Sequence, residues 1–67
     1  MNITNRIESN PSVMLGKPVI KGTRITVELL LKKLAEGNTV EQILNSYDHI
    51  TIEDIYASIN YADLKSR

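Results

Sequence analysis

Three threonines, each directly before a run of helix-forming residues, constrain the fold of this chain more than any other feature. Thr26 precedes a run that stops at Gly37, and glycine suits the left-handed conformation in which helices often end. Thr39 opens a second, shorter run, and Gln42 three residues later completes the pattern of a capping box. Thr51 opens the third run. The sequence therefore predicts three short helices.

The third run has apolar residues at helical spacing, which indicates one buried face. We expect that face to consist of Ile52, Ile55, Ile59 and Ala62. Tyr56 is expected beside this stripe. The residues expected to point away from it are Glu53, Ser58, Asn60 and Asp63.

The first part of the chain contains only short apolar runs between turns. Val13–Leu15 and Val19–Ile20 lie between glycine-containing turns and are predicted to be short extended segments. We therefore expect a mainly α fold with a single domain over residues 1–67. Residues 26–65 are expected to form a trihelical helix-turn-helix bundle, and residues 1–25 an extended arm with short strands or a short β-hairpin.

Size favours association with another chain. A domain of 67 residues without cysteine has one small core and no disulfide to support it. Strand addition between two N-terminal arms would cover apolar residues that the helices leave exposed, so we expect a homodimer. The residues that motivate it are Ile3, Ile7, Val13, Met14, Leu15, Val19 and Ile20.

The composition indicates the class of protein and the compartment in which it is expected. A hydrophobic content of 42% with 24% charged residues is typical of a globular chain. No apolar run reaches the roughly 18 residues that span a bilayer, and the polar N-terminus is no secretory signal. The expectation is a cytoplasmic protein with no membrane contact.

The formal net charge of zero hides a split between the two halves of the chain. Residues 1–33 carry six basic and two acidic residues, a net +4, and residues 34–67 carry two basic and six acidic residues, a net −4. Such a split fits a basic face offered to nucleic acid, or head-to-tail charge complementarity between subunits. It also fits charges that are simply solvated.

The second and third helices form a helix-turn-helix candidate, whose later helix would enter the major groove of DNA. The candidate DNA contacts are Thr51, Ser58, Asn60 and Tyr61. Glu53 and Asp54 oppose this hypothesis, because phosphates dominate affinity for DNA. No Arg or Lys occurs between Lys33 and Lys65.

A glycine-containing stretch offers a second candidate surface. Lys17, Lys21 and Arg24 are spaced so that a loop gathers them on one side, beside the turns at Gly16 and Gly22. Such a loop suits a phosphate or carboxylate partner. The alternative is that the glycines only make turns and the basic side chains are solvated. A nucleotide P-loop is excluded, because Lys21 precedes Gly22.

Catalysis is not expected. His49 lies in a connection beside Asp48 and reads as a turn residue. Glu53 and Asp54 are adjacent on a helix and point in different directions, which is wrong for a shared metal or an acid/base pair. We expect a protein that is not an enzyme and has no cofactor and no metal.

The stretch from Gly16 to Val27, the helix that follows, and the Thr39–Tyr47 and Ile50–Ile55 segments closely resemble the bacterial domain-of-unknown-function 433 family. The resemblance covers nearly the whole chain. Its most specific part is the signature Gly16, Lys17, Pro18, Gly22, Thr23 and Arg24. Family members are small trihelical, homeodomain-like proteins and predicted antitoxins encoded beside a toxin similar to PIN-type ribonucleases.

The resemblance implies a non-catalytic antitoxin of a toxin–antitoxin system that sequesters a PIN-like ribonuclease and autoregulates its operon. We expect Lys17, Lys21 and Arg24 to meet the toxin, because a metal-dependent nuclease gathers carboxylates at its mouth. Two alternatives remain open at this stage. One is a helix-turn-helix DNA-binding regulator without a toxin, and the other is a structural dimerisation module.

Overall fold

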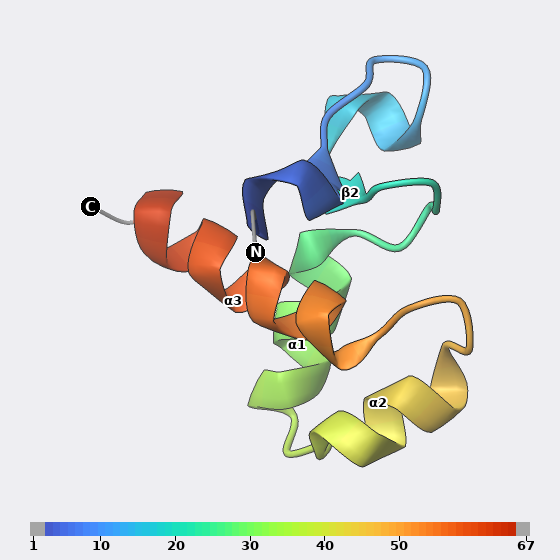
Figure 1. Cartoon of the computed structure of the whole chain (residues 1–67), viewed down its shortest axis with the longest axis vertical. Coiled ribbons are helices and arrows are strands. Elements are labelled where there is room, and N and C mark those ends of the chain that lie inside the picture. Colours follow the sequence, from blue (N-terminus) through green and yellow to red (C-terminus); the bar gives the residue numbers. More distant parts are fainter. Residues whose placement is uncertain (1–2, 66–67) are drawn as a thin grey trace.

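The three helices form where the threonines predict them. The computed structural model describes residues 3–65, with side-chain exposure from residue 5 onward. Each threonine caps its helix: Thr26 Oγ1 accepts from the Leu29 N–H at 3.0 Å, Thr39 forms a complete capping box, and Thr51 Oγ1 accepts an N–H bond at 3.4 Å. The helices are α1 (Val27–Ala35), α2 (Val40–Ser46) and α3 (Ile52–Lys65), and Figure 1 shows their arrangement. The predicted mainly helical fold is confirmed.

A short antiparallel sheet precedes the helices. It pairs β1 (Ile7–Glu8) with β2 (Val19–Ile20), so that Ile7 lies opposite Ile20 and Glu8 opposite Val19. Of two short 3-10 helices, η1 (Ile3–Arg6) precedes β1 and η2 (Met14–Gly16) lies between β1 and β2. A short N-terminal sheet was expected, and it is present.

The expectation that Val13–Leu15 is extended holds for Val13 but is wrong for Met14 and Leu15. Met14 and Leu15 have positive φ values of 50° and 57°, which places them in the left-handed region, and they form η2. The partner of β2 lies earlier in the chain, at β1. Backbone bonds within the loop impose this conformation, since the Gly16 N–H donates to Val13 O and the Lys17 N–H donates to Met14 O.

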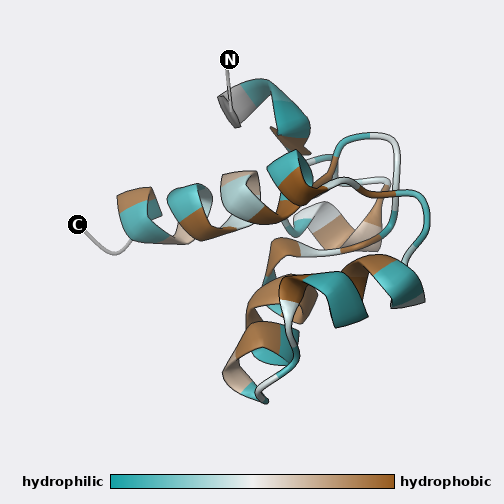
Figure 2. Ribbon diagram, turned by 60° about the horizontal axis from the view of Figure 1, so that its bottom comes forward, coloured by the Kyte–Doolittle hydropathy of each residue, from teal (hydrophilic) through white to brown (hydrophobic). Residues whose placement is uncertain are grey.

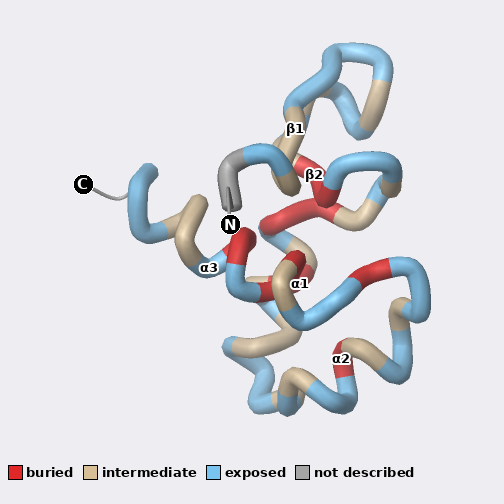
Figure 3. The backbone as a smooth tube through the Cα atoms, viewed as in Figure 1, coloured by how far each residue is buried: buried red, intermediate tan, exposed pale blue. Residues whose placement is uncertain are grey.

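The core is shared between the sheet and all three helices. Its buried cluster takes one residue from β2, one from each helix and one from the connection between α2 and α3: Ile20, Leu30, Ile43, Ile55 and Ile50. Val19 of β2, outside this cluster, is also buried and has no exposed surface. Figure 3 shows the buried stretch of β2 beside α1. The segment expected as an arm is therefore folded into the bundle.

This packing weakens the case for a dimer formed by strand addition. Val19 and Ile20 are already buried within one chain, and Ile7 and Val13 are half-buried. The side chain of Ile3 lies outside the residues whose exposure is described. Both edges of β2 are also occupied, by β1 on one side and by a bridge to Thr26 on the other. Strand addition would have only the two residues of β1 as a template.

The buried face of α3 differs from the predicted one. Of the four residues expected to be buried, only Ile55 is; Ile52 and Ile59 are exposed and Ala62 is half-buried. The inward face consists of Asp54, Ile55, Ala57 and Ser58. Small side chains at two of these positions let α3 pack closely on its neighbours.

An ion pair sets the rotation of α3. Arg6 Nη1 lies 3.1 Å from Asp54 Oδ1, and the side chain of Asp54 is only 11% exposed. The other carboxylate oxygen accepts the Thr51 N–H at 2.9 Å, while Thr51 Oγ1 accepts the Asp54 N–H. Asp54 thus closes a reciprocal cap and fastens η1 to α3. It faces inward, so the expectation that it would repel a polyanion is wrong.

Removing the Asp54 carboxylate is expected to destabilise the fold. Asp54→Ala loses the cap and removes the carboxylate that lies 3.1 Å from Arg6 Nη1, so the free energy of unfolding should fall by about 2 to 4 kcal/mol. Glu53→Ala is the matched control, because it removes the neighbouring carboxylate of the same turn and should cost less than about 1 kcal/mol. Urea denaturation measures both, and equal losses would contradict this role of Asp54.

Candidate functional site

The outward face of α3 carries an apolar stripe. Ile52, Tyr56 and Ile59 follow one another at spacings of four and three residues, and they are 38%, 51% and 44% exposed. Residues at this spacing lie on one side of a helix. Figure 2 shows apolar and polar bands along α3. These side chains lie on a different side of α3 from the buried Asp54, Ala57 and Ser58, and together they expose apolar surface to solvent.

The four candidate DNA contacts do not form one exposed surface. Ser58 has no exposed surface, and its hydroxyl donates to the Asp54 carbonyl at 3.0 Å. The expectation that Ser58 faces away from the core is therefore wrong. Asn60 and Tyr61 are half-buried. Thr51 is exposed, but its hydroxyl oxygen already accepts the capping bond of α3.

The three candidate cations are all exposed, and they lie at the two ends of β2. Lys21 and Arg24 are on the turn that joins β2 to α1. Lys17 precedes β2, where its Nζ is 3.9 Å from Glu28 Oε1, with both side chains more than half exposed. A pair this exposed contributes little stability. Lys21 and Arg24 thus share one turn, while Lys17 has an acidic neighbour of its own.

The signature residues build the turns around β2. Thr23 donates its hydroxyl to Ile20 O at 2.8 Å and accepts the Ile25 N–H at 3.0 Å. Pro18 O accepts the Val27 N–H at 3.0 Å, which ties the start of β2 to α1. Gly16 and Gly22 have φ values of 84° and 81°. These contacts hold β2 in the core and give the signature Gly16, Pro18, Gly22 and Thr23 a structural role.

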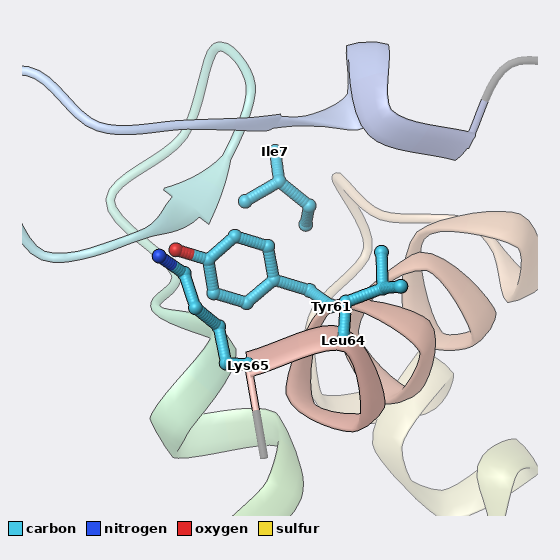
Figure 4. A pocket seen from close by; sticks show the side chains of 4 residues that line it. All are labelled: Ile7, Tyr61, Leu64 and Lys65. Atoms are coloured by element: carbon cyan, nitrogen blue, oxygen red, sulfur yellow. The ribbon is translucent and has the colours of Figure 1, made fainter. Parts of the chain in front are cut away.

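A cavity of about 350 Å³ opens where β1 meets the last turn of α3. Ile7, Tyr61, Leu64 and Lys65 line it, and Figure 4 shows their side chains around it. Three of the four contribute apolar surface. Lys65 Nζ lies 5.7 Å from the centre of the Tyr61 ring, close enough for a cation–π contact.

Metal-ligating side chains do not cluster within residues 3–65. Among the described residues no group of three or more His, Cys, Asp or Glu side chains could hold a metal ion. His49 Nε2 is 3.7 Å from Asp48 Oδ1 in the connection between α2 and α3, and both side chains are more than 80% exposed. Across residues 3–65, every helix is too short or too polar to span a membrane.

Sequence reasoning did not single out the exposed surface of Tyr56 and Leu64, which are 51% and 53% exposed. The signal for Tyr56 was present, because Ile52, Tyr56 and Ile59 fit helical spacing as well as the predicted stripe does. Leu15 was expected among the exposed apolar residues of the N-terminal part, and it is 94% exposed. Its left-handed backbone had no such signal, because leucine rarely adopts that conformation.

Comparisons with known proteins point to one family. The family described as "Protein of unknown function (DUF433)" matches residues 7–62. The chain is 32% identical over 57 residues to the uncharacterized protein y4eO of Sinorhizobium fredii (strain NBRC 101917 / NGR234), a match that covers 85% of this chain and 26% of that protein. It is also similar to the crystal structure of a DUF433 member protein from Anabaena variabilis ATCC 29413, with a TM-score of 0.86 and 31% identity, over 92% of this chain and 61% of that one. The chain thus spans only part of each.

Gly22 is expected to contribute to the stability of the fold only through its backbone conformation. A Cβ at Gly22 would meet no atom within 4 Å, yet φ is +81°. Gly22→Ala should therefore lower the free energy of unfolding by about 1 kcal/mol through strain. Gly22→Asn is the control, because asparagine tolerates the left-handed region and should lose less than half as much. Chemical denaturation distinguishes them, and an unchanged stability of Gly22→Ala would contradict the structural role.

Proposed function

The chain belongs to the DUF433 family of proteins of unknown function, and from this premise we propose that it is a non-catalytic, antitoxin-like module that binds and silences a PIN-like ribonuclease. The family resemblance supplies the class of partner. The physical support is the apolar stripe of α3, formed by Ile52, Tyr56 and Ile59. This stripe is the surface that would contact the ribonuclease.

The composition of the stripe favours a protein partner over DNA. Aromatic and aliphatic side chains are enriched in the centres of protein interfaces and supply most of their binding energy. A recognition helix in the major groove of DNA instead presents amide, hydroxyl and basic groups to the base edges. The exposed first turns of α3 offer instead Ile52 and Tyr56, with the half-buried carboxylate of Glu53 between them.

Lys21 and Arg24 give the module a second way to act on a nuclease. Both are exposed on the turn after β2. A metal-dependent nuclease gathers carboxylates around its cations. Opposite charges at the rim of an interface accelerate association more than they strengthen the complex. We assign the apolar stripe to holding the partner and these two cations to steering it.

The test is co-purification of the chain with the product of the adjacent gene, followed by an RNA cleavage assay with and without the module. A stable complex that suppresses cleavage supports the proposal. Absence of a complex, together with DNA binding that weakens steeply between low and physiological salt, would replace it with the helix-turn-helix regulator. Absence of both would leave dimerisation as the function.

Introducing a charge into the stripe is expected to break the complex. Tyr56→Asp places a carboxylate in the middle of an apolar contact, so the dissociation constant should rise at least about tenfold through faster dissociation. Asn45→Asp, which adds the same charge on the exposed surface of α2, is the control. Titration of ribonuclease inhibition measures both. Equal effects of the two variants would contradict the assignment of the stripe.

Reversing the two cations is expected to slow binding. The double variant Lys21→Glu with Arg24→Glu should lower the association rate constant by about tenfold at low salt and leave the dissociation rate nearly unchanged. The difference from the unmodified chain should shrink as salt screens the charges. Stopped-flow binding to the ribonuclease measures this. Unchanged association and inhibition would exclude these cations from the interface.

A further inference from the structure

Leu15 stands on a rigid loop and is almost completely exposed. Leu15 is 94% exposed, and Met14 beside it is 43% exposed. The loop is held by bonds from the Val13 N–H to Asn10 O and from the Ser12 N–H to Asn10 Oδ1, at 2.8 and 2.9 Å. Figure 1 shows this loop projecting beyond the rest of the fold. The chain thus presents an apolar knob, by which we mean the Met14 and Leu15 side chains.

The backbone of the knob is unfavourable for its residues. Met14 and Leu15 lie in the left-handed region at φ 50° and 57°, where Cβ crowds the neighbouring carbonyl. Glycine or asparagine would adopt this conformation more easily. Large apolar side chains held there and turned to solvent gain nothing within the isolated chain. Such strain is found where a surface is used for binding.

A receptor for an apolar side chain exists on the same molecule. The cavity lined by Ile7, Tyr61 and Leu64 measures about 350 Å³. An apolar cavity of about 150 Å³ is large enough for a benzene ring, so this one has room for a leucine side chain. Tyr61 and Leu64 come from the end of α3 and Ile7 from β1. None of these three lies in the apolar stripe of α3.

We propose that two copies of this chain associate by inserting the knob of each into the cavity of the other. Because knob and cavity are on one chain, two reciprocal insertions related by a twofold axis give a closed dimer. The site is incomplete in one chain, since the partner copy supplies the side chain that fills it. This inference is independent of the proposed ribonuclease partner.

Composition matches between the two surfaces. Residues 9–16 of the loop contain no charged residue, and three of the four residues that line the cavity, Ile7, Tyr61 and Leu64, are uncharged. The fourth is Lys65, whose Nζ lies 5.7 Å from the centre of the Tyr61 ring. Insertion of the knob therefore brings no second charged side chain against Lys65.

The first test separates association from folding. Leu15→Asn removes the apolar side chain and suits a left-handed backbone, so the monomer should melt no lower than the unmodified chain. Its dimer dissociation constant in sedimentation equilibrium should rise at least tenfold. Leu15→Gly should behave in the same way. Tyr56→Asp, outside this contact, should leave dimerisation unchanged.

The second test locates the cavity. The chain has no cysteine, so an equimolar mixture of Leu15→Cys and Leu64→Cys can form a mixed disulfide only between copies. We expect that heterodimer under mild oxidation, and far less when Leu64→Cys is replaced by Asn45→Cys. Mixing Leu15→Asn with Leu64→Gln should also recover part of the dimer, because one intact knob then faces one intact cavity.

The two tests together establish or overturn the reciprocal insertion of knob and cavity. Loss of dimer in Leu15→Asn together with the Leu15–Leu64 crosslink establishes the exchange. An unmodified chain that stays monomeric at millimolar concentration overturns it, and so does a dimer that Leu15→Asn leaves intact. A crosslink no stronger than that of the Asn45 control overturns the cavity assignment. Loss of ribonuclease inhibition in Tyr56→Asp with dimerisation intact would test the other surface separately.

Discussion

The carboxylate of Asp54 is the interaction on which the rest of this small fold depends. One oxygen pairs with Arg6 and the other closes the cap of α3 on Thr51. Burial of an unpaired carboxylate would be strongly unfavourable, so Asp54 can face inward only with both partners present. A domain of this size has too small a core to fix every element by apolar packing. Here a polar contact fastens the N-terminal segment to the last helix.

The rotation of α3 follows from that contact. With Asp54 turned inward, Ser58 one helical turn later is also buried, and its hydroxyl is satisfied by the Asp54 carbonyl. Ile52, Tyr56 and Ile59 are then carried to the outside. A helix whose inward face held the predicted isoleucines would have left a polar surface outside, suited to a different partner. The chemistry available for recognition is thus a consequence of one part-buried ion pair.

Helix starts could be predicted from the sequence, because a threonine cap and its bonds are local. The face that α3 buries could not, since Ile52, Ile55 and Ile59 fit one stripe while Ile52, Tyr56 and Ile59 fit another. What decides between them is a pair of residues 48 positions apart, Arg6 and Asp54. The left-handed backbone at Leu15 could not be predicted from the sequence either, because leucine rarely adopts that conformation. The candidate cations Lys17, Lys21 and Arg24 were placed on the surface as expected, but their partner stays a prediction.

The signature that identifies the family and the surfaces that would bind partners are different parts of the molecule. Gly22 and Thr23 shape the turn that holds β2 in the core, and their bonds are internal. A chain can therefore keep this signature, and with it the fold, while the stripe of α3 or the knob at Leu15 changes. Fold and partner choice are then free to vary separately. If that is so, members of the family with the same turns need not bind the same protein, and the exposed positions of α3 are the ones to compare.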